Sequence, residues 1–107
     1  MKITKDMEAL AKQFGNRMDT REGGIAEQLW VIRDCMSMIE SHLAYNNYDF
    51  MENRYKDRYV EELGYENVKE IWEMMKKYFD ENCYVKENVY TDCEGLSYNC
   101  IIDKNER

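Results

Sequence analysis

The sequence lacks proline, has a single histidine and has fewer basic than acidic residues, and such deficits exclude several classes of protein. There is no proline and only one histidine, His42, so a site that needs two imidazole ligands, such as the HExxH zinc site, cannot form within this chain. No apolar run reaches the roughly 18 residues that a membrane-spanning helix needs, so we expect no membrane span. Lysine and arginine number 15 against 22 aspartate and glutamate residues. The resulting net charge of -7 argues against direct binding of nucleic acid.

Catalytic and metal-binding motifs are also missing. The sequence has no P-loop, no GxGxxG, no EF-hand loop and no GxSxG, and its four cysteines form no CxxC pair. No apolar segment follows the basic residues near the start, so we expect a cytoplasmic protein with reduced thiols. We therefore predict no cofactor, no metal and no catalytic residues. A thiol- or zinc-dependent small enzyme is an alternative, and it would draw on His42 with Cys35, Cys83, Cys93 and Cys100.

The residues that are present suffice for one folded domain. The chain has 107 residues, and we assign residues 1–107 to a single globular domain. Apolar residues make up 44% and aromatic residues 13%, a composition that opposes disorder. Methionine occurs eight times and tyrosine nine times. Because a tyrosine hydroxyl requires water or a hydrogen-bond partner, we expect several tyrosines to be partly exposed.

Two adjoining apolar stripes predict a helix over residues 25–46. Their members recur at steps of three and four, which places them on one side of a helix. Together they form an apolar arc wider than a surface helix needs. We therefore expect either the central helix of the domain or a helix that also packs against a second copy of the chain. The stripes are Ile25, Leu29, Ile32, Met36, Ile39 and Leu43, and Val31, Cys35, Met38, His42 and Tyr45.

Apolar periodicity predicts three further helices, and capping residues mark the ends of two of them. Asp49 and Glu52 have the spacing of a capping box, as do Asn67 and Glu70. Gly64 between them is typical of a residue that ends a helix. These helices are expected at residues 3–18, 49–63 and 67–82.

The period changes toward two after the last predicted helix. Residues 84–91 and 96–102 are rich in valine, isoleucine, tyrosine and threonine, and residues 92–95 between them end in glycine. This pattern predicts a β-hairpin that sets Tyr90 opposite Tyr98. The predicted fold is therefore α+β: about four helices followed by a C-terminal β-hairpin that docks on them.

Carboxylates and tyrosines together are the strongest functional signal. Several charges are spaced for i,i+4 ion pairs, namely Glu52–Lys56, Lys69–Glu73 and Glu73–Lys77. The remaining acidic excess, together with tyrosine rings, suits a basic groove on another protein, where carboxylates take the place of phosphates. We predict a partner-binding set of Tyr55, Tyr59, Glu62, Tyr65, Glu66, Glu70, Glu73, Asp80 and Glu81.

The general profile of the chain resembles that of a group of small inhibitor proteins. In size, charge and lack of catalytic motifs the chain is similar to the inhibitors carried by phages and mobile elements, anti-CRISPR proteins among them. The resemblance covers the general profile only and implies an acidic nucleic-acid mimic that inhibits or regulates a nuclease or another basic nucleic-acid-binding protein. A self-associating structural or regulatory subunit is the alternative, in which Ile25, Leu29, Trp30, Ile32 and Met36 form a homodimer interface.

Overall fold

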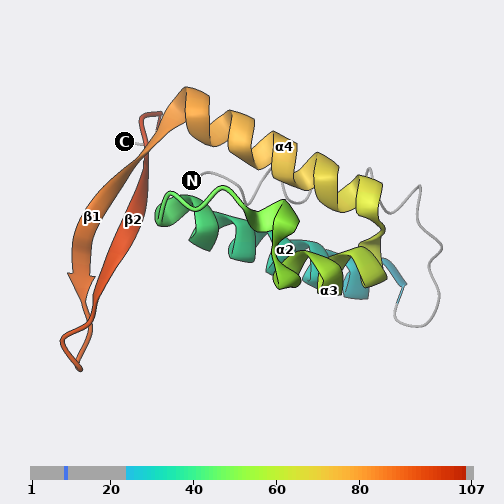
Figure 1. Cartoon of the computed structure of the whole chain (residues 1–107), viewed down its shortest axis with the longest axis horizontal. Helices are drawn as coiled ribbons and strands as arrows, with labels where there is room; N and C mark the ends of the chain where they lie inside the picture. Colours follow the sequence, from blue (N-terminus) through green and yellow to red (C-terminus); the bar gives the residue numbers. More distant parts are fainter. Residues whose placement is uncertain (1–8, 10–23, 106–107) are drawn as a thin grey trace.

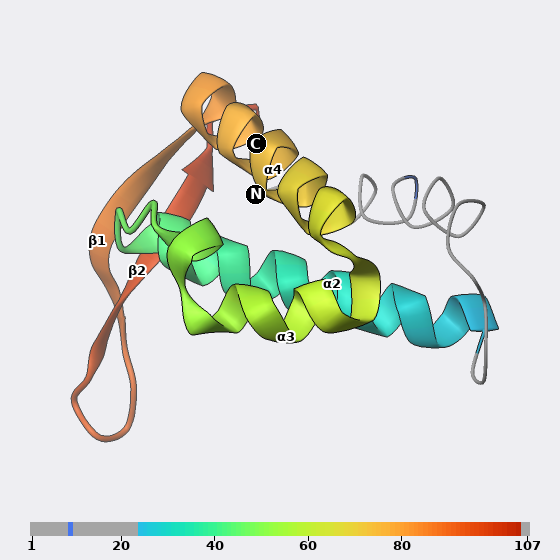
Figure 2. The ribbon, with the colours of Figure 1, turned by 45° about the vertical axis from the view of Figure 1, so that its right-hand side comes forward.

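The computed structural model describes residue 9 and residues 24–105 of the chain. In this part, three α-helices precede a two-stranded antiparallel sheet, so the fold is α+β with a helical majority. The predicted helix over residues 3–18 falls almost entirely outside the described residues. Figures 1 and 2 show α2 (Gly24–Ala44) and α3 (Arg54–Leu63) side by side, with α4 (Tyr65–Asn82) packed over them. No helix of the described residues is long and apolar enough to cross a bilayer.

Helix α2 is the central element of the described part. It packs against α3, α4 and strand β2, as its wide apolar arc predicts. The apolar side chains of its middle and C-terminal turns are buried, each contributing about 1.5–3 kcal/mol to stability relative to exposure. These buried side chains are Ile32, Cys35, Met36, Ile39 and Leu43.

The segment predicted as one helix over residues 49–63 is broken. Phe50–Glu52 form a 3-10 turn, η1, and α3 begins only at Arg54. Asn53 between them is extended, and its side-chain oxygen accepts a hydrogen bond from the Tyr55 amide. The predicted cap at Asp49 is wrong, since its side chain makes no capping hydrogen bond. Asn53 satisfies the free amide at the helix start and thereby sets where α3 begins.

The break allows Phe50 to enter the core. Its ring is fully buried and stacks against Tyr59 and Trp72, with centroid distances of 6.3 and 5.9 Å. The His42 ring meets Phe50 edge-on at 5.4 Å. Aromatic contacts of this kind add about 0.5–1.5 kcal/mol each beyond the area they bury. Phe50 therefore connects α2, α3 and α4.

Gly64 ends α3, as predicted, but α4 begins earlier than residue 67. Gly64 has φ +91°, ψ +146°, a conformation that favours glycine, and its amide donates to the Val60 carbonyl. Helix α4 starts directly after it, at Tyr65. The predicted capping box at Asn67 is wrong, because the side-chain amide of Asn67 donates to the Leu63 backbone carbonyl at 2.7 Å. Asn67 thus satisfies a backbone carbonyl at the end of α3 and does not cap a backbone amide at the start of α4.

The hairpin follows α4 without a loop. Strands β1 (Cys83–Thr91) and β2 (Ser97–Asp103) are antiparallel, and Tyr90 lies opposite Tyr98 as predicted. Gly95, with φ +83°, closes the connecting turn. The register shifts between Lys86 and Tyr90, where Asn88 also has a positive φ. This bulge separates a docked inner half of the hairpin from an outer half.

Hydrogen bonds made by β2 and by the residue after it hold the hairpin against the helices. The Tyr78 hydroxyl donates to the buried Asp103 carboxylate, which raises the pKa of Tyr78 to about 12. The side-chain amide of Asn99 donates to the Ala44 carbonyl at 2.9 Å, and the backbone amide of Lys104 donates to the Asn82 carbonyl. The predicted docking of the hairpin on the helices is therefore confirmed.

Candidate functional site

Most tyrosines of the chain lie at the surface, as predicted. Six of the nine are between 43% and 55% exposed. Tyr59 is the opposite case: it is 1% exposed and belongs to the core, so its predicted role in partner binding is wrong. The exposed rings are Tyr45, Tyr48, Tyr55, Tyr65, Tyr84 and Tyr98.

The connection between α3 and α4 concentrates acidic side chains. Glu61, Glu62 and Glu66 are exposed there, together with the ring of Tyr65, and we call these four residues the acidic corner. None of its three carboxylates has an ion-pair partner within the described part of the chain. Glu66 lies in the first turn of α4, where the helix dipole favours a negative charge. Glu61 and Glu62 have no such local role, because they lie in the last turn of α3.

The predicted i,i+4 pairs do not neutralise this acidity. The structure shows none of the three among the described residues and instead pairs Lys76 with Asp80 at 2.6 Å. Glu73 is exposed and has no ion-pair partner in the described part. Lys76 also lies 4.3 Å from the centre of the Tyr48 ring. This lysine is therefore engaged on two sides, by Asp80 and by the Tyr48 ring.

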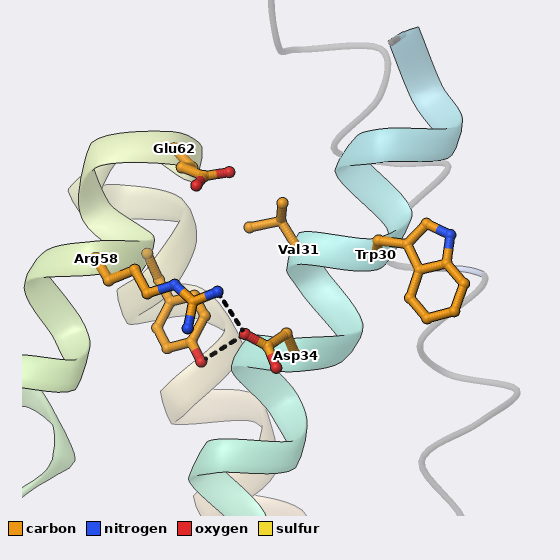
Figure 3. A pocket seen from close by; sticks show the side chains of 6 residues that line it. Trp30, Val31, Asp34, Arg58 and Glu62 are labelled. Atoms are coloured by element: carbon orange, nitrogen blue, oxygen red, sulfur yellow. Dashed lines mark hydrogen bonds and ion pairs between the residues drawn. The ribbon is translucent and has the colours of Figure 1, made fainter.

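A groove of about 250 Å³ separates α2 from α3 next to the acidic corner (Figure 3). Inside it, the Asp34 carboxylate accepts a hydrogen bond from the Tyr59 hydroxyl at 2.9 Å and lies 3.5 Å from the Arg58 guanidinium. Arg58 also lies over the Tyr59 ring, 5.6 Å from its centre. The groove is lined by Trp30, Val31, Asp34, Arg58, Tyr59 and Glu62.

The groove holds one balanced ion pair and one uncompensated carboxylate. Asp34 and Arg58 neutralise each other, whereas Glu62 faces the groove from α3 without a cation. Burial, followed by the hydrogen bond to Asp34, raises the pKa of Tyr59, so its hydroxyl stays a donor at neutral pH. Asp34 and Arg58 were not in the predicted set. They lie 24 residues apart, and only the packing of α2 on α3 brings them together.

The acidic residues of α4 form a second surface. A shallow hollow of about 370 Å³ gathers the predicted residues Glu73, Asp80 and Glu81 around Trp72. Two lysines, Lys76 and Lys77, line the same hollow and reduce its net charge. The predicted residue Glu70 is half-buried and already engaged in an interaction. The predicted residue Tyr55 lies at the start of α3, and the centre of its ring is 6.0 Å from the centre of the His42 ring. The predicted set is therefore divided: Glu62 and Glu66 are unpaired carboxylates of the acidic corner, and Glu73 and Glu81 are unpaired carboxylates of α4.

The residues predicted for self-association are divided as well. Trp30 is 70% exposed, and its ring points away from Arg58 and Glu62 on the other side of α2 (Figure 3). Ile32 and Met36 are buried in the core of the chain itself, so their predicted place in a dimer interface is wrong. Leu29 is half-buried and packs against the core. The side chain of Ile25 lies outside the described part.

The four cysteines and His42 lie in different surroundings. None of the four cysteines forms a disulfide, and no three histidine, cysteine or acidic side chains of the described residues lie close enough to hold a metal ion. Burial, with a smaller effect from Asp34, raises the pKa of Cys35 to about 12. This thiol therefore stays protonated and weakly nucleophilic at neutral pH. His42 is buried against Phe50 and Tyr55, with its Nδ1 3.7 Å from Asp49.

The chain matches no protein-family model, no curated protein and no solved structure at a significant level.

Proposed function

We propose that this protein binds a basic protein partner through the acidic corner and performs no chemistry of its own. The partner is a nuclease or another nucleic-acid-binding protein, which this protein inhibits or regulates as an acidic mimic of nucleic acid. The observation that carries the proposal is the exposure of Glu61, Glu62 and Glu66, beside the ring of Tyr65, without any cation to neutralise them in the described part.

The chemistry of the corner explains how such binding would work. Uncompensated carboxylates steer a basic partner toward the surface and fix its register. An aromatic ring among them supplies apolar contact area, and tyrosine is enriched among residues that dominate binding energy. The adjoining groove offers Glu62 and the exposed Trp30 as further contacts. A surface evolved only for solubility would not require tyrosine and tryptophan beside its charges.

A compartment and a mode of inhibition follow from the same proposal. We place the protein in the cytoplasm, a location that the four free cysteines support. A groove that binds nucleic acid carries lysine and arginine at phosphate spacing, and carboxylates can pair with the same cations. Occupation of that groove by the acidic corner would exclude the nucleic acid from it.

A pair of matched variants tests the proposal. In the first, Glu61, Glu62 and Glu66 are changed to lysine; in the second, three exposed and unpaired carboxylates of other elements, Glu52, Glu87 and Glu94, are changed instead. Both variants have the same net charge. Partners co-purified with the unmodified protein are identified by mass spectrometry, and their affinity for all three proteins is then measured by calorimetry at low and high salt.

The proposal predicts a basic partner whose affinity falls at least tenfold, about 1.4 kcal/mol, in the corner variant and less than threefold in the control. Affinity should also fall as salt rises, because exposed charges are screened beyond about 8–10 Å near physiological ionic strength. Nucleic acid added to the complex should compete with the protein. An acidic partner, or equal losses in both variants, would contradict a role for the corner.

Self-association is a second candidate, favoured by the 70% exposure of Trp30. Tryptophan is enriched at protein–protein interfaces and among the residues that dominate binding energy. Light scattering on a size-exclusion column separates the two candidates. A dimer that dissociates in the variant Trp30→Ala supports the second, and a monomer at high micromolar concentration excludes it.

A further inference from the structure

The groove between α2 and α3 has an excess of negative charge. Among the described residues that line it, two carboxylates, Asp34 and Glu62, face one guanidinium, Arg58. Arg58 lies 3.5 Å from the Asp34 carboxylate, and Glu62 has no ion-pair partner in the described part of the chain. One further positive charge would therefore balance the side chains of this groove.

The Asp34 carboxylate is held in place and keeps one oxygen available. The buried Tyr59 donates its hydroxyl to Oδ2 of Asp34 at 2.9 Å, and the Arg58 guanidinium lies near the same oxygen. Oδ1 of Asp34 has no hydrogen-bond partner among the described residues, and the side chain is 48% exposed. Because a carboxylate accepts several hydrogen bonds, Asp34 can receive a further donor without releasing Tyr59.

The size and walls of the groove suit a single long side chain. Figure 3 shows the Glu62 side chain pointing from α3 toward Val31 on α2. Val31 is half-buried and packs against the core, so it gives the groove an apolar wall. The groove volume of about 250 Å³ lies below the range of about 300–1,000 Å³ that is typical of small-ligand pockets. A side chain with an apolar stem and a charged end matches these features.

We propose that this groove receives a lysine side chain of the basic protein partner. The methylene stem of the lysine lies along Val31, and its ammonium donates hydrogen bonds to the Glu62 carboxylate and to Oδ1 of Asp34. This inference rests on the proposed function, to which it adds the chemical identity of one contact.

The rings of the groove favour lysine over arginine. A guanidinium gains binding energy by stacking on an aromatic ring, whereas an ammonium is compact and acts as a point charge. The Tyr59 ring is 1% exposed and already lies beneath Arg58, whose guanidinium carbon is 5.6 Å from the ring centre. The Trp30 ring points away from Glu62 (Figure 3). A second guanidinium would therefore find no open ring face among the described residues of the groove, and an ammonium needs none.

Short peptides test the groove without the partner. Blocked pentapeptides with a central lysine, acetyl-lysine or arginine between glycines are titrated into the full-length, nitrogen-15-labelled protein, and amide shifts are followed by NMR. Acetyl-lysine keeps the stem of lysine but has no charge. We expect shifts at the amides of Val31, Asp34 and Glu62. Affinity for the lysine peptide should be about fivefold above that for acetyl-lysine and about twofold above that for arginine.

Three variants locate the binding. Glu62→Gln keeps the shape of an exposed side chain and removes its charge, so we expect it to weaken the lysine peptide about fivefold. Asp34→Asn should weaken the same peptide about threefold. Glu94→Gln removes an exposed carboxylate of the hairpin turn and should leave the affinity unchanged. Because Glu62 is exposed, Glu62→Gln remains informative even if Asp34→Asn disturbs the packing of α2 on α3.

Three results would overturn the proposal. They are equal affinity for lysine and acetyl-lysine, tighter binding of the arginine peptide, and equal losses in Glu62→Gln and Glu94→Gln.

The peptides and the partner together separate this inference from the proposed function. If the lysine peptide binds but no basic partner is found, the groove stands and the proposed function fails. If Glu61→Lys with Glu66→Lys lowers the affinity of a basic partner while Asp34→Asn leaves it unchanged, the function stands and the groove has no part in it. A loss of partner affinity in Asp34→Asn that matches the loss of peptide affinity supports both.

Discussion

The helical body and the outer half of the hairpin use the same pair of residue types in different ways. In the body, Tyr59 donates to Asp34 at 2.9 Å, and the ring is buried between α2 and α3. In the hairpin, Tyr98 donates to Asp92 at 2.8 Å, and the ring is exposed. The bond length is nearly the same, but the surroundings decide its role: the first bond stabilises packing, and the second holds a ring toward solvent. Four predictions compare the two regions, three by changes in stability and one by thiol reactivity.

The largest difference in the free energy of unfolding is expected between Phe50→Ala and Leu96→Ala. Phe50 is fully buried against three rings, so its removal should lower the free energy of unfolding by about 3–5 kcal/mol. Leu96 is 55% exposed at the hairpin turn, and its loss should cost less than about 0.5 kcal/mol. Urea denaturation followed by circular dichroism measures both. Equal losses would show that the hairpin turn belongs to the same core.

The second largest difference in stability is expected between alanine substitutions at the two glycines with positive φ. At Gly64 both φ (+91°) and ψ (+146°) lie in a region nearly restricted to glycine, so Gly64→Ala should cost about 1–3 kcal/mol. Gly95 has φ +83° in an open turn, where an added Cβ meets no atom within 4 Å. We expect Gly95→Ala to cost about 1 kcal/mol. Thermal melts of both variants test this order, which a larger loss at Gly95 would reverse.

Removal of the two hydroxyls gives a smaller difference. Tyr59→Phe should cost about 1–1.5 kcal/mol, because the hydrogen bond to Asp34 is partly buried. Tyr98→Phe should cost less than about 0.5 kcal/mol at its exposed site. Folding raises the pKa of Tyr59. The contribution of its hydroxyl to the free energy of unfolding is therefore complete below the ordinary tyrosine pKa of about 10 and declines as pH rises above that value. Denaturation at pH 8 and pH 11 should show a steeper decline for the unmodified protein than for Tyr59→Phe.

The cysteines should differ in reactivity with almost no change in stability. Cys93 is exposed in the hairpin turn, whereas Cys35 is buried and its pKa is raised to about 12. Titration with a thiol reagent at pH 8 should label Cys93 rapidly and Cys35 only after unfolding. Cys93→Ser should remove the rapid phase and leave the melting temperature unchanged. Rapid labelling of Cys35 in the native protein would show that α2 opens in solution.

The elements that the sequence predicted best are those with a strong local signal. The two stripes predicted α2 as a central helix, and the alternation after residue 83 predicted the hairpin and the pair of Tyr90 with Tyr98. Capping was predicted less well. Asp49 and Asn67 each have a suitable partner three residues later, but the hydrogen bonds formed depend on where neighbouring elements end.

The candidate site shows the same limit. Acidic residues and exposed tyrosines were expected from composition and periodicity, but Glu61 of the acidic corner was not in the predicted set. The division of that set between the corner and α4 was not predicted, and the burial of Tyr59 removes it from the surface. The stripes left open whether Ile32 and Met36 face the core or a second copy, and the structure places both in the core. Each depends on the rotation of one helix against another, which a single helix does not encode.

The sequence by itself determined the helical majority, the hairpin and an acidic surface with tyrosine rings, because periodicity and composition act within a few residues of each other. Only the tertiary structure decided which carboxylates stay unpaired and which side chains line the groove between α2 and α3. Asp34 meets Arg58 and Tyr59 across two helices, and Asn99 joins β2 to the end of α2. Such contacts join residues far apart in the chain, and their formation depends on how the whole core packs.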